Sequence, residues 1–134
     1  MKLLLDTHIL LWAAGGEAEG SDADPMPPTV RRLLLHTGNE LIFSAASIWE
    51  VAIKAGLGRR DFRADAHLLR RGLLANGYGE LEISGAHAAA VSQLPPIHRD
   101  PFDRMLVAQA TLEGLTLLTA DAVLATYPGP IRKA

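Results

Sequence analysis

Four carboxylates stand where one structural element of the chain should give way to the next: Asp6, Glu50, Asp103 and Asp121. Asp6 ends the apolar run 3–5, and Asp121 follows the apolar run 115–118. The other two acids lie near the starts of helical patterns. Because an open parallel sheet gathers its ligands at the carboxyl ends of its strands, we expect these side chains to converge there. Such a site would be strongly negative and would need a cation.

Each acid also has a purely structural interpretation. Glu50 comes three residues after Ser47, and Asp103 comes three residues after Asp100, which is the spacing of a capping box. The remaining two acids suit turns or helix caps, since aspartate favours both roles. Taken singly, each acid is explained about as well by a cap as by a site.

Taken together, the four acids favour a metal site. Two carboxylates about 6 Å apart repel by roughly 3 kcal/mol at an effective dielectric of about 20, and four would cost several times that. Either some acids are protonated or a divalent cation binds among them. The chain has no cysteine, and ligands that are all oxygen favour Mg²⁺ or Mn²⁺. A hard cation in this setting can activate water and stabilise charge on phosphate oxygens.

The composition is that of one compact domain, and we take residues 1–134 as a single unit. A net charge of −2 gives no global signature of nucleic-acid binding, so contacts to RNA would come from local basic groups. These basic groups are Lys54, Arg59, Arg60, Arg63 and the pair Arg70-Arg71. Asp6 and His8 interrupt the first apolar stretch, and no run reaches membrane-spanning length, so we expect a cytoplasmic protein with no membrane partner.

Short apolar stretches alternate with helical patterns along the whole chain. The strands lack a clean apolar–polar alternation, which is typical of a parallel sheet covered on both faces. The expected fold is therefore α/β, a three-layer α/β/α sandwich with a short central parallel sheet. We predict strands at 2–5, 41–43, 81–83 and 115–119, with a marginal one at 131–134. We predict helices at 8–14, 29–36, 44–55, 63–76, 86–94, 101–113 and 121–126, and a surface loop at 15–24 whose role is unassigned.

The sequence resembles PIN-domain ribonucleases, and in particular VapC-like toxins of type II toxin–antitoxin pairs. The matching stretches are Leu3-Leu4-Leu5-Asp6-Thr7-His8, Ser44-Ala45-Ala46-Ser47-Ile48-Trp49-Glu50-Val51, the block 98–110 around Asp100-Pro101-Phe102-Asp103-Arg104, and Leu118-Thr119-Ala120-Asp121. They occur in the family's order across nearly the whole chain. The resemblance implies a Rossmann-like fold and a Mg²⁺- or Mn²⁺-dependent endoribonuclease. It places the catalytic acids on Asp6, Glu50, Asp103 and Asp121, and it implies a cognate antitoxin and a homodimer.

Other polar and aromatic residues are assigned simpler roles. We expect Thr7 to make strand-end hydrogen bonds, His98 to support its loop, and Arg104 to pair with an acid. Trp12 and Trp49 lie in apolar patterns and are expected in the core. Ile48, Val51, Ala52 and Leu57 with Trp12 would also suit a surface that faces a second subunit or the antitoxin.

Two other functions compete with RNA cleavage. Asp6 could be the nucleophile of a phosphatase, although such enzymes need a second acid two residues on, where this chain has His8. Alternatively, the acids could hold a structural ion in a non-catalytic binding module. A small α/β fold does not by itself decide between them.

Overall fold

The computed structural model describes residues 1–14, 26–57 and 64–134. The strands are β1 (Lys2–Leu5), β2 (Glu40–Ser44), β3 (Gly79–Leu81), β4 (Thr116–Thr119) and β5 (Ile131–Lys133). The helices are α1 (Thr7–Ala13), α2 (Pro28–Leu35), α3 (Ala45–Gly56), α4 (Ala66–Ala75), α5 (Gly85–Ala90) and α6 (Pro101–Glu113), with 3₁₀ turns η2 (Val91–Gln93) and η3 (Leu124–Thr126). The strands form one parallel sheet in the order β3-β2-β1-β4-β5.

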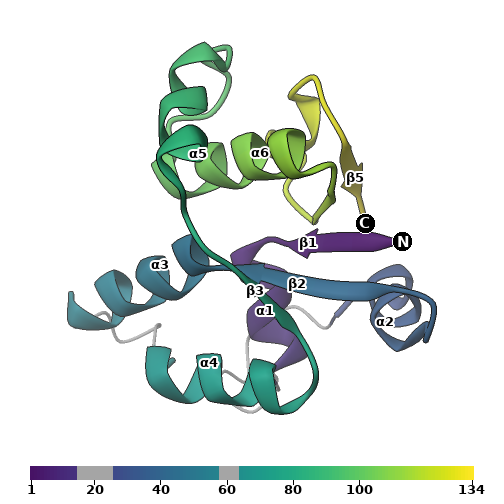
Figure 1. Ribbon diagram of the computed structural model, residues 1–134. Coiled ribbons are helices and arrows are strands. Elements are labelled where there is room, and N and C mark those ends of the chain that lie inside the picture. The colour runs from purple at the N-terminus through teal and green to yellow at the C-terminus, as the bar shows by residue number, and fades with distance from the viewer. Residues whose placement is uncertain (15–25, 58–63) are drawn as a thin grey trace.

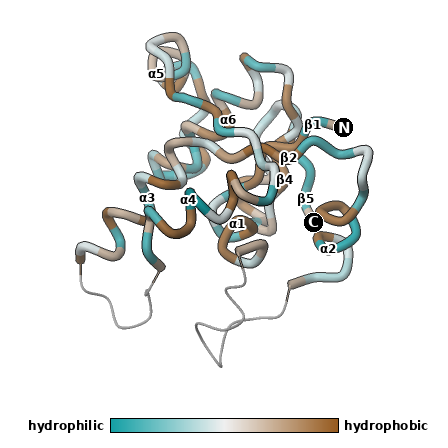
Figure 2. The backbone as a smooth tube through the Cα atoms, turned by 60° about the horizontal axis from the view of Figure 1, so that its bottom comes forward, coloured by the Kyte–Doolittle hydropathy of each residue, from teal (hydrophilic) through white to brown (hydrophobic). Residues whose placement is uncertain are grey.

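The central strand β1 is buried on both faces, which explains its continuous apolar sequence. Leu3 and Leu5 face an apolar cluster shared with α1, α2, α3 and α4, whereas Leu4 faces a second cluster shared with α6 and η3. Figure 1 shows these two helical layers on opposite sides of the sheet. Hydrophobic positions gather along the central strands, whereas the exposed turns are mostly hydrophilic (Figure 2). The predicted three-layer α/β fold is confirmed.

Several predicted helix ends are confirmed by their capping contacts. Asp100 caps α6 by accepting hydrogen bonds from the backbone of Phe102 (2.8 Å) and Asp103 (3.4 Å). Gly114 ends the same helix with φ of 68°, a left-handed conformation that glycine adopts without a steric cost. Ser84 caps α5 in a capping box with His87. The ends of α6 therefore follow from local sequence, and they fix where the acid in its first turn lies.

The edge strands differ from the prediction. The third strand runs over 79–81 rather than 81–83, because its register is set by backbone pairing of Gly79 with Ile42, and Ile83 is exposed. The marginal last strand does form, and Ile131 pairs with Leu117 of β4. Edge strands bury little side-chain area, so hydrophobicity marks their position poorly.

Some leucines in the leucine-rich helices α2 and α4 face solvent. Leu35 in α2 is 72% exposed, and Leu68 in α4 is 60% exposed. Successive helical residues are rotated by about 100°, so adjacent leucines cannot all face the sheet. Helix α4 also begins later than predicted, because the side chain of Asp65 accepts the Leu68 N–H and caps the helix there.

Some predictions fall on residues 15–25 and 58–63, outside the described residues. They are the surface loop at 15–24 and the basic residues Arg59, Arg60 and Arg63. Within residues 1–14, 26–57 and 64–134, none of the helices combines the length and hydrophobicity that crossing a bilayer would require.

Candidate active site

The candidate site lies between β1 and β4, where the order in which strands are added to the sheet reverses. These strands are neighbours, with Leu5 paired to Leu118. The chain leaves β1 towards β2 on one side of the sheet and leaves β4 towards β5 on the other. The carboxyl ends of strands whose connections diverge in this way border a crevice, the usual ligand site of open α/β sheets. Asp6 immediately follows β1, and Asp121 follows β4 by two residues.

Asp6 is buried and fully engaged in hydrogen bonds. Its backbone N–H donates to the Leu118 carbonyl (3.1 Å), and its Oδ1 accepts from the Ile9 N–H (2.9 Å) as the cap of α1. Its Oδ2 accepts from the Thr119 hydroxyl (2.5 Å). Burial raises the pKa of Asp6, and the bond from Thr119 opposes that shift. The cap interpretation is therefore correct for Asp6, and the same side chain also lies at the mouth of the crevice.

Glu50 reaches the same region from α3. It is buried, and its Oε1 accepts from the Thr7 hydroxyl (2.7 Å), while Lys54 Nζ donates to its Oε2 (2.5 Å). The capping-box interpretation is wrong for Glu50, because Ser44, not Ser47, caps α3. Ser47 instead lies 2.9 Å from the Thr7 hydroxyl. Thr7 therefore does more than make the expected hydrogen bonds at the end of a strand. It links the end of β1, where Asp6 lies, to Glu50.

Asp103 also has a strongly perturbed carboxyl group. Burial raises the pKa of Asp103 to about 7, and the negative charge of Asp100 adds to the shift. The charges of Glu50 and Asp6 raise this pKa further, whereas His98 lowers it. The charges of Glu50 and Asp6 therefore act on Asp103, although of the four predicted acids only Asp103 and Asp121 belong to the tightest group among the described residues.

Asp121 and His98 complete the crowded end of the site. Asp121 Oδ1 accepts from the backbone of Val123 (2.8 Å) and Leu124 (3.2 Å), and its own N–H donates to Thr119 Oγ1 (3.0 Å). Partial burial opposes ionisation, but these backbone bonds and His98 together lower the pKa of Asp121. Asp103 and Asp121 thus differ in protonation behaviour although they lie in one cluster.

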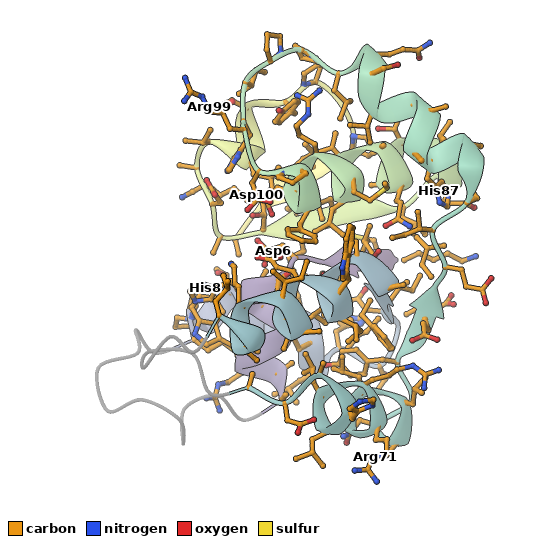
Figure 3. The ribbon with its side chains drawn as sticks, turned by 90° about the vertical axis from the view of Figure 1, so that its left-hand side faces the viewer. Asp6, His8, Arg71, His87, Arg99 and Asp100 are labelled. Atoms are coloured by element: carbon orange, nitrogen blue, oxygen red, sulfur yellow. The ribbon has the colours of Figure 1, made fainter. Side chains whose placement is uncertain are left out.

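The tightest group in the described part of the chain consists of His98, Asp103 and Asp121, whose ligand atoms all lie within 4.8 Å of one another. His98 Nε2 is 3.3 Å from Asp103 Oδ2 and 3.4 Å from Asp121 Oδ2. Asp6 is tied to Asp121 through the Thr119 hydroxyl. In Figure 3 Asp6 and Asp100 are labelled one above the other near the middle of the view, whereas His87 is labelled further to the right.

The sequence did not mark His98 as a site residue, because its position before a helix indicated only that it supports the loop. The available signal was its position: it immediately precedes Arg99 and the Asp100 cap, so its ring lies beside the start of the helix that carries Asp103. Residues placed just before a helix start at the carboxyl end of a sheet commonly face a ligand site.

Two further assignments need correction. Among the described residues Arg104 pairs with no acid; it donates to the carbonyls of Val91, Leu94 and Pro95, which lie in η2 and in the turn after it. Trp49 is not in the core but is 59% exposed, with its ring edge-on to Phe102 at 5.1 Å. Both residues lie on helices that border the site rather than in its centre.

The predicted contact surface for a second subunit or antitoxin is also smaller than expected. Val51 and Trp12 are buried and cannot contribute to it. Leu57 is exposed, as is Ala52, and both remain on the surface of α3.

The donor set fits a hard divalent cation. The four acids offer carboxylate oxygens, which Mg²⁺ and Mn²⁺ favour, and the described residues contain no thiolate. Burial is the main cause of the raised pKa of Asp103, and the negative charges of Asp100, Glu50 and Asp6 crowd around it and add to the shift. A divalent cation would relieve that crowding without protonating an acid.

Comparison with known proteins agrees with this architecture. A family model of the PIN domain matches residues 3–130. VapBC2 from Rickettsia felis, solved bound to a DNA fragment from their promoter, has 14% identity and a TM-score of 0.69, covering 100% of this chain and 99% of that chain. A toxin–antitoxin complex from Klebsiella pneumoniae has 21% identity and a TM-score of 0.60, covering 98% and 96%. DNA-bound VapBC from Salmonella typhimurium has 19% identity and a TM-score of 0.62, covering 99% and 98%.

A search of curated protein sequences gave no match. The family match nevertheless spans most of the chain, and the solved structures share its fold over nearly their full length. The chain belongs to the PIN domain family, a family of nucleases.

Proposed function

We propose that this protein is a Mg²⁺- or Mn²⁺-dependent endoribonuclease and the toxin of a toxin–antitoxin pair. The observation that carries the proposal is the group of Asp103, Asp121 and His98 at the switch point of the sheet. Asp6 is linked to Asp121 through Thr119, and the charges of Asp6 and Glu50 act on Asp103. Membership of the PIN family supports nuclease chemistry. The similarity in fold to toxin–antitoxin complexes supports the biological role.

In this proposal Asp6, Asp103 and Asp121 hold the metal, and Glu50 completes the set. The bound ion would lower the pKa of a water molecule and offset charge on phosphate oxygens. Thr119 orients the Asp6 carboxylate by donating to Oδ2, and it simultaneously fixes the Asp121 backbone. The Thr7 hydroxyl holds Glu50 by donating to its Oε1. The two threonines therefore keep three of the acids in fixed orientations.

The proposed partners follow from the same reasoning. We propose an RNA substrate, a cognate antitoxin and a homodimer for this chain. We also propose that residues 1–134 form one domain and that the protein acts in the cytoplasm. The structures from Klebsiella pneumoniae and Salmonella typhimurium are complexes of toxin with antitoxin, which supports the antitoxin. Lys54, at the edge of the site with 36% of its side chain exposed, supplies a positive charge beside Glu50.

The direct test is cleavage of RNA in the presence of Mg²⁺ or Mn²⁺. Asp103→Asn should reduce the cleavage rate at least a hundredfold while the circular dichroism spectrum is unchanged. Glu82→Gln serves as the matched control, because Glu82 is an exposed acid and its side chain has none of the contacts described for the site. Full activity of Asp103→Asn would reject the assignment of the site.

The toxin role is tested by expressing the chain alone in bacteria. Growth arrest is expected, and Asp6→Ala should relieve it, as should coexpression of a small open reading frame adjacent to the gene. Normal growth despite confirmed expression of folded protein would contradict the toxin role while leaving nuclease activity open to the assay above.

A further inference from the structure

His98 is held from several directions by groups outside the acidic cluster. Its backbone N–H donates to the Tyr127 hydroxyl (2.8 Å), and that hydroxyl lies 3.3 Å from the His98 carbonyl, to which it donates. Arg104 donates to the same hydroxyl at 3.2 Å. Tyr127 is buried, with 4% of its surface exposed. Arg104 and Tyr127 therefore form a clamp that fixes the backbone of His98 above the start of α6.

The contacts of the ring decide which nitrogen carries the hydrogen. The Asp100 backbone N–H lies 3.0 Å from His98 Nδ1, and a backbone N–H can only donate. Nδ1 must therefore be the acceptor, so the ring hydrogen is on Nε2. Nε2 is the atom that lies between Asp103 Oδ2 and Asp121 Oδ2, at 3.3 and 3.4 Å.

We propose that His98 is a positioning residue whose Nε2–H donates to Asp121 and lies beside Asp103, and that it is not itself a metal ligand. This inference rests on the proposed metal site. Ligation through Nε2 would move the hydrogen to Nδ1, and the Asp100 N–H would then face another donor. Asp100 also caps α6 through its side chain, so a rearrangement there would disturb the first turn that carries Asp103.

The role of such a donor is to restrict the carboxylates before the cation arrives. A carboxylate that accepts a fixed N–H has fewer orientations to lose on binding, and groups that orient metal ligands in this way typically contribute 10- to 100-fold in metal affinity. The proposal also explains why Arg104, next to Asp103 in sequence, turns away from the acids: its guanidinium supports the loop that positions His98.

The first experiment observes the ring nitrogens of His98 by ¹⁵N NMR, with and without Mg²⁺, in the full-length protein. We expect Nε2 to be pyrrole-like and Nδ1 to be pyridine-like in both states. His67, which is exposed on α4, provides the reference for an imidazole in solvent. Exchange of the two assignments on addition of Mg²⁺ would show Nε2 ligation and would overturn the proposal.

The second experiment measures Mn²⁺ binding by calorimetry. His98→Ala should weaken binding by about tenfold or more, whereas His98→Gln, which keeps an N–H donor at a similar reach, should recover most of the loss. His67→Ala is the matched control and should bind as the unaltered protein does. Unchanged affinity of His98→Ala, or equal losses in the alanine and glutamine variants with folding intact, would overturn the proposal.

The outcomes separate this inference from the proposed function. If the unaltered protein binds Mn²⁺ and His98→Ala weakens that binding, but no RNA is cleaved, the inference stands and the ribonuclease proposal falls. If RNA is cleaved and His98→Ala binds Mn²⁺ normally, the ribonuclease proposal stands and the inference about His98 falls. If the unaltered protein binds neither Mg²⁺ nor Mn²⁺, both the metal-dependent ribonuclease proposal and the inference about His98 are rejected. Should His98→Ala not fold, the comparison of His98→Gln with the unaltered protein and the NMR assignment decide the question.

Discussion

The Thr119 hydroxyl connects two acids that are far apart in sequence. It donates to Asp6 Oδ2 and accepts from the Asp121 N–H, so one oxygen fixes the side chain of the first acid and the backbone of the second. The Thr7 hydroxyl contacts two side chains: it donates to Glu50 Oε1 and lies 2.9 Å from Ser47 Oγ. At the scale of residues, the hydroxyl neighbours of the acids decide how the site is built.

The raised pKa of Asp103 predicts an unusual pH dependence in the metal-free protein. Its unfolded pKa is about 3.9 and its folded pKa is about 7, so the folded state binds more protons between these values. The contribution of Asp103 to the free energy of unfolding should therefore be highest below pH 4. As the pH rises from 4 to 7, this contribution should fall by up to about 1.4 kcal/mol per pH unit. The raised pKa of Asp6 acts in the same direction.

Urea unfolding in EDTA at a series of pH values measures this effect. Asp103→Asn should flatten the decline between pH 4 and 7. Asp65→Asn is an informative control, because the pKa of Asp65 is lowered by its bond to the Leu68 N–H and its contribution is lost as the pH falls. A decline that persists unchanged in Asp103→Asn would show that another group is responsible.

Sequence reasoning located the four acids but not their immediate contacts. An acid that follows an apolar strand can be found by inspection, because strand ends share one edge of a parallel sheet. The donors to these acids depend on which side chains the tertiary structure brings together, as the 113-residue separation of Thr119 and Asp6 shows. His98 and the true partners of Arg104 were missed for the same reason.

At the scale of elements, a buried hydrogen bond ties together the two helices that carry Glu50 and Asp103. Ser44 caps α3 and donates to Gln109 Oε1 of α6 (2.5 Å). Gln109 is fully buried, and its amide also donates to the Glu82 carbonyl (3.2 Å). Local sequence predicted the ends of α6 but could not reveal this link, because its partners are 65 residues apart.

Gln109→Met should therefore destabilise the protein. The substitution keeps the side-chain volume but leaves the Ser44 hydroxyl and the Glu82 carbonyl without their partner, at a cost of about 1–3 kcal/mol in the free energy of unfolding. Chemical denaturation measures the loss. Gln93→Met, in the exposed turn η2, is the control and should change stability by less than about 0.5 kcal/mol.

At the scale of the whole molecule, the sheet places the site between its two helical layers. Helices α1 and α3 lie on one face of the sheet and α6 lies on the other. The carboxylates of Asp6, Glu50 and Asp103 therefore come from different layers. A cation held by these acids would link the layers. Ligand binding to the folded state alone stabilises it by an amount set by the ligand concentration relative to the dissociation constant.

Mn²⁺ at one hundred times its dissociation constant should add about 2.7 kcal/mol to the free energy of unfolding. Thermal unfolding followed with increasing Mn²⁺ measures this gain, and EDTA should reverse it. The double variant Asp6→Asn with Asp103→Asn should show no gain, while Glu82→Gln should respond fully. A metal-independent melting temperature in the unaltered protein would contradict the proposed metal site.

The order of the strands has a consequence for synthesis of the protein. Strand β1 occupies the middle of the sheet, and one of its two neighbours, β4, is synthesised only after β2 and β3. A nascent chain halted before residue 116 therefore has Asp6 without Thr119 or Asp121, and its central strand has one bare edge. The proposed site therefore cannot form until synthesis has passed Asp121, because the carboxylates that would hold the cation come from both halves of the sheet.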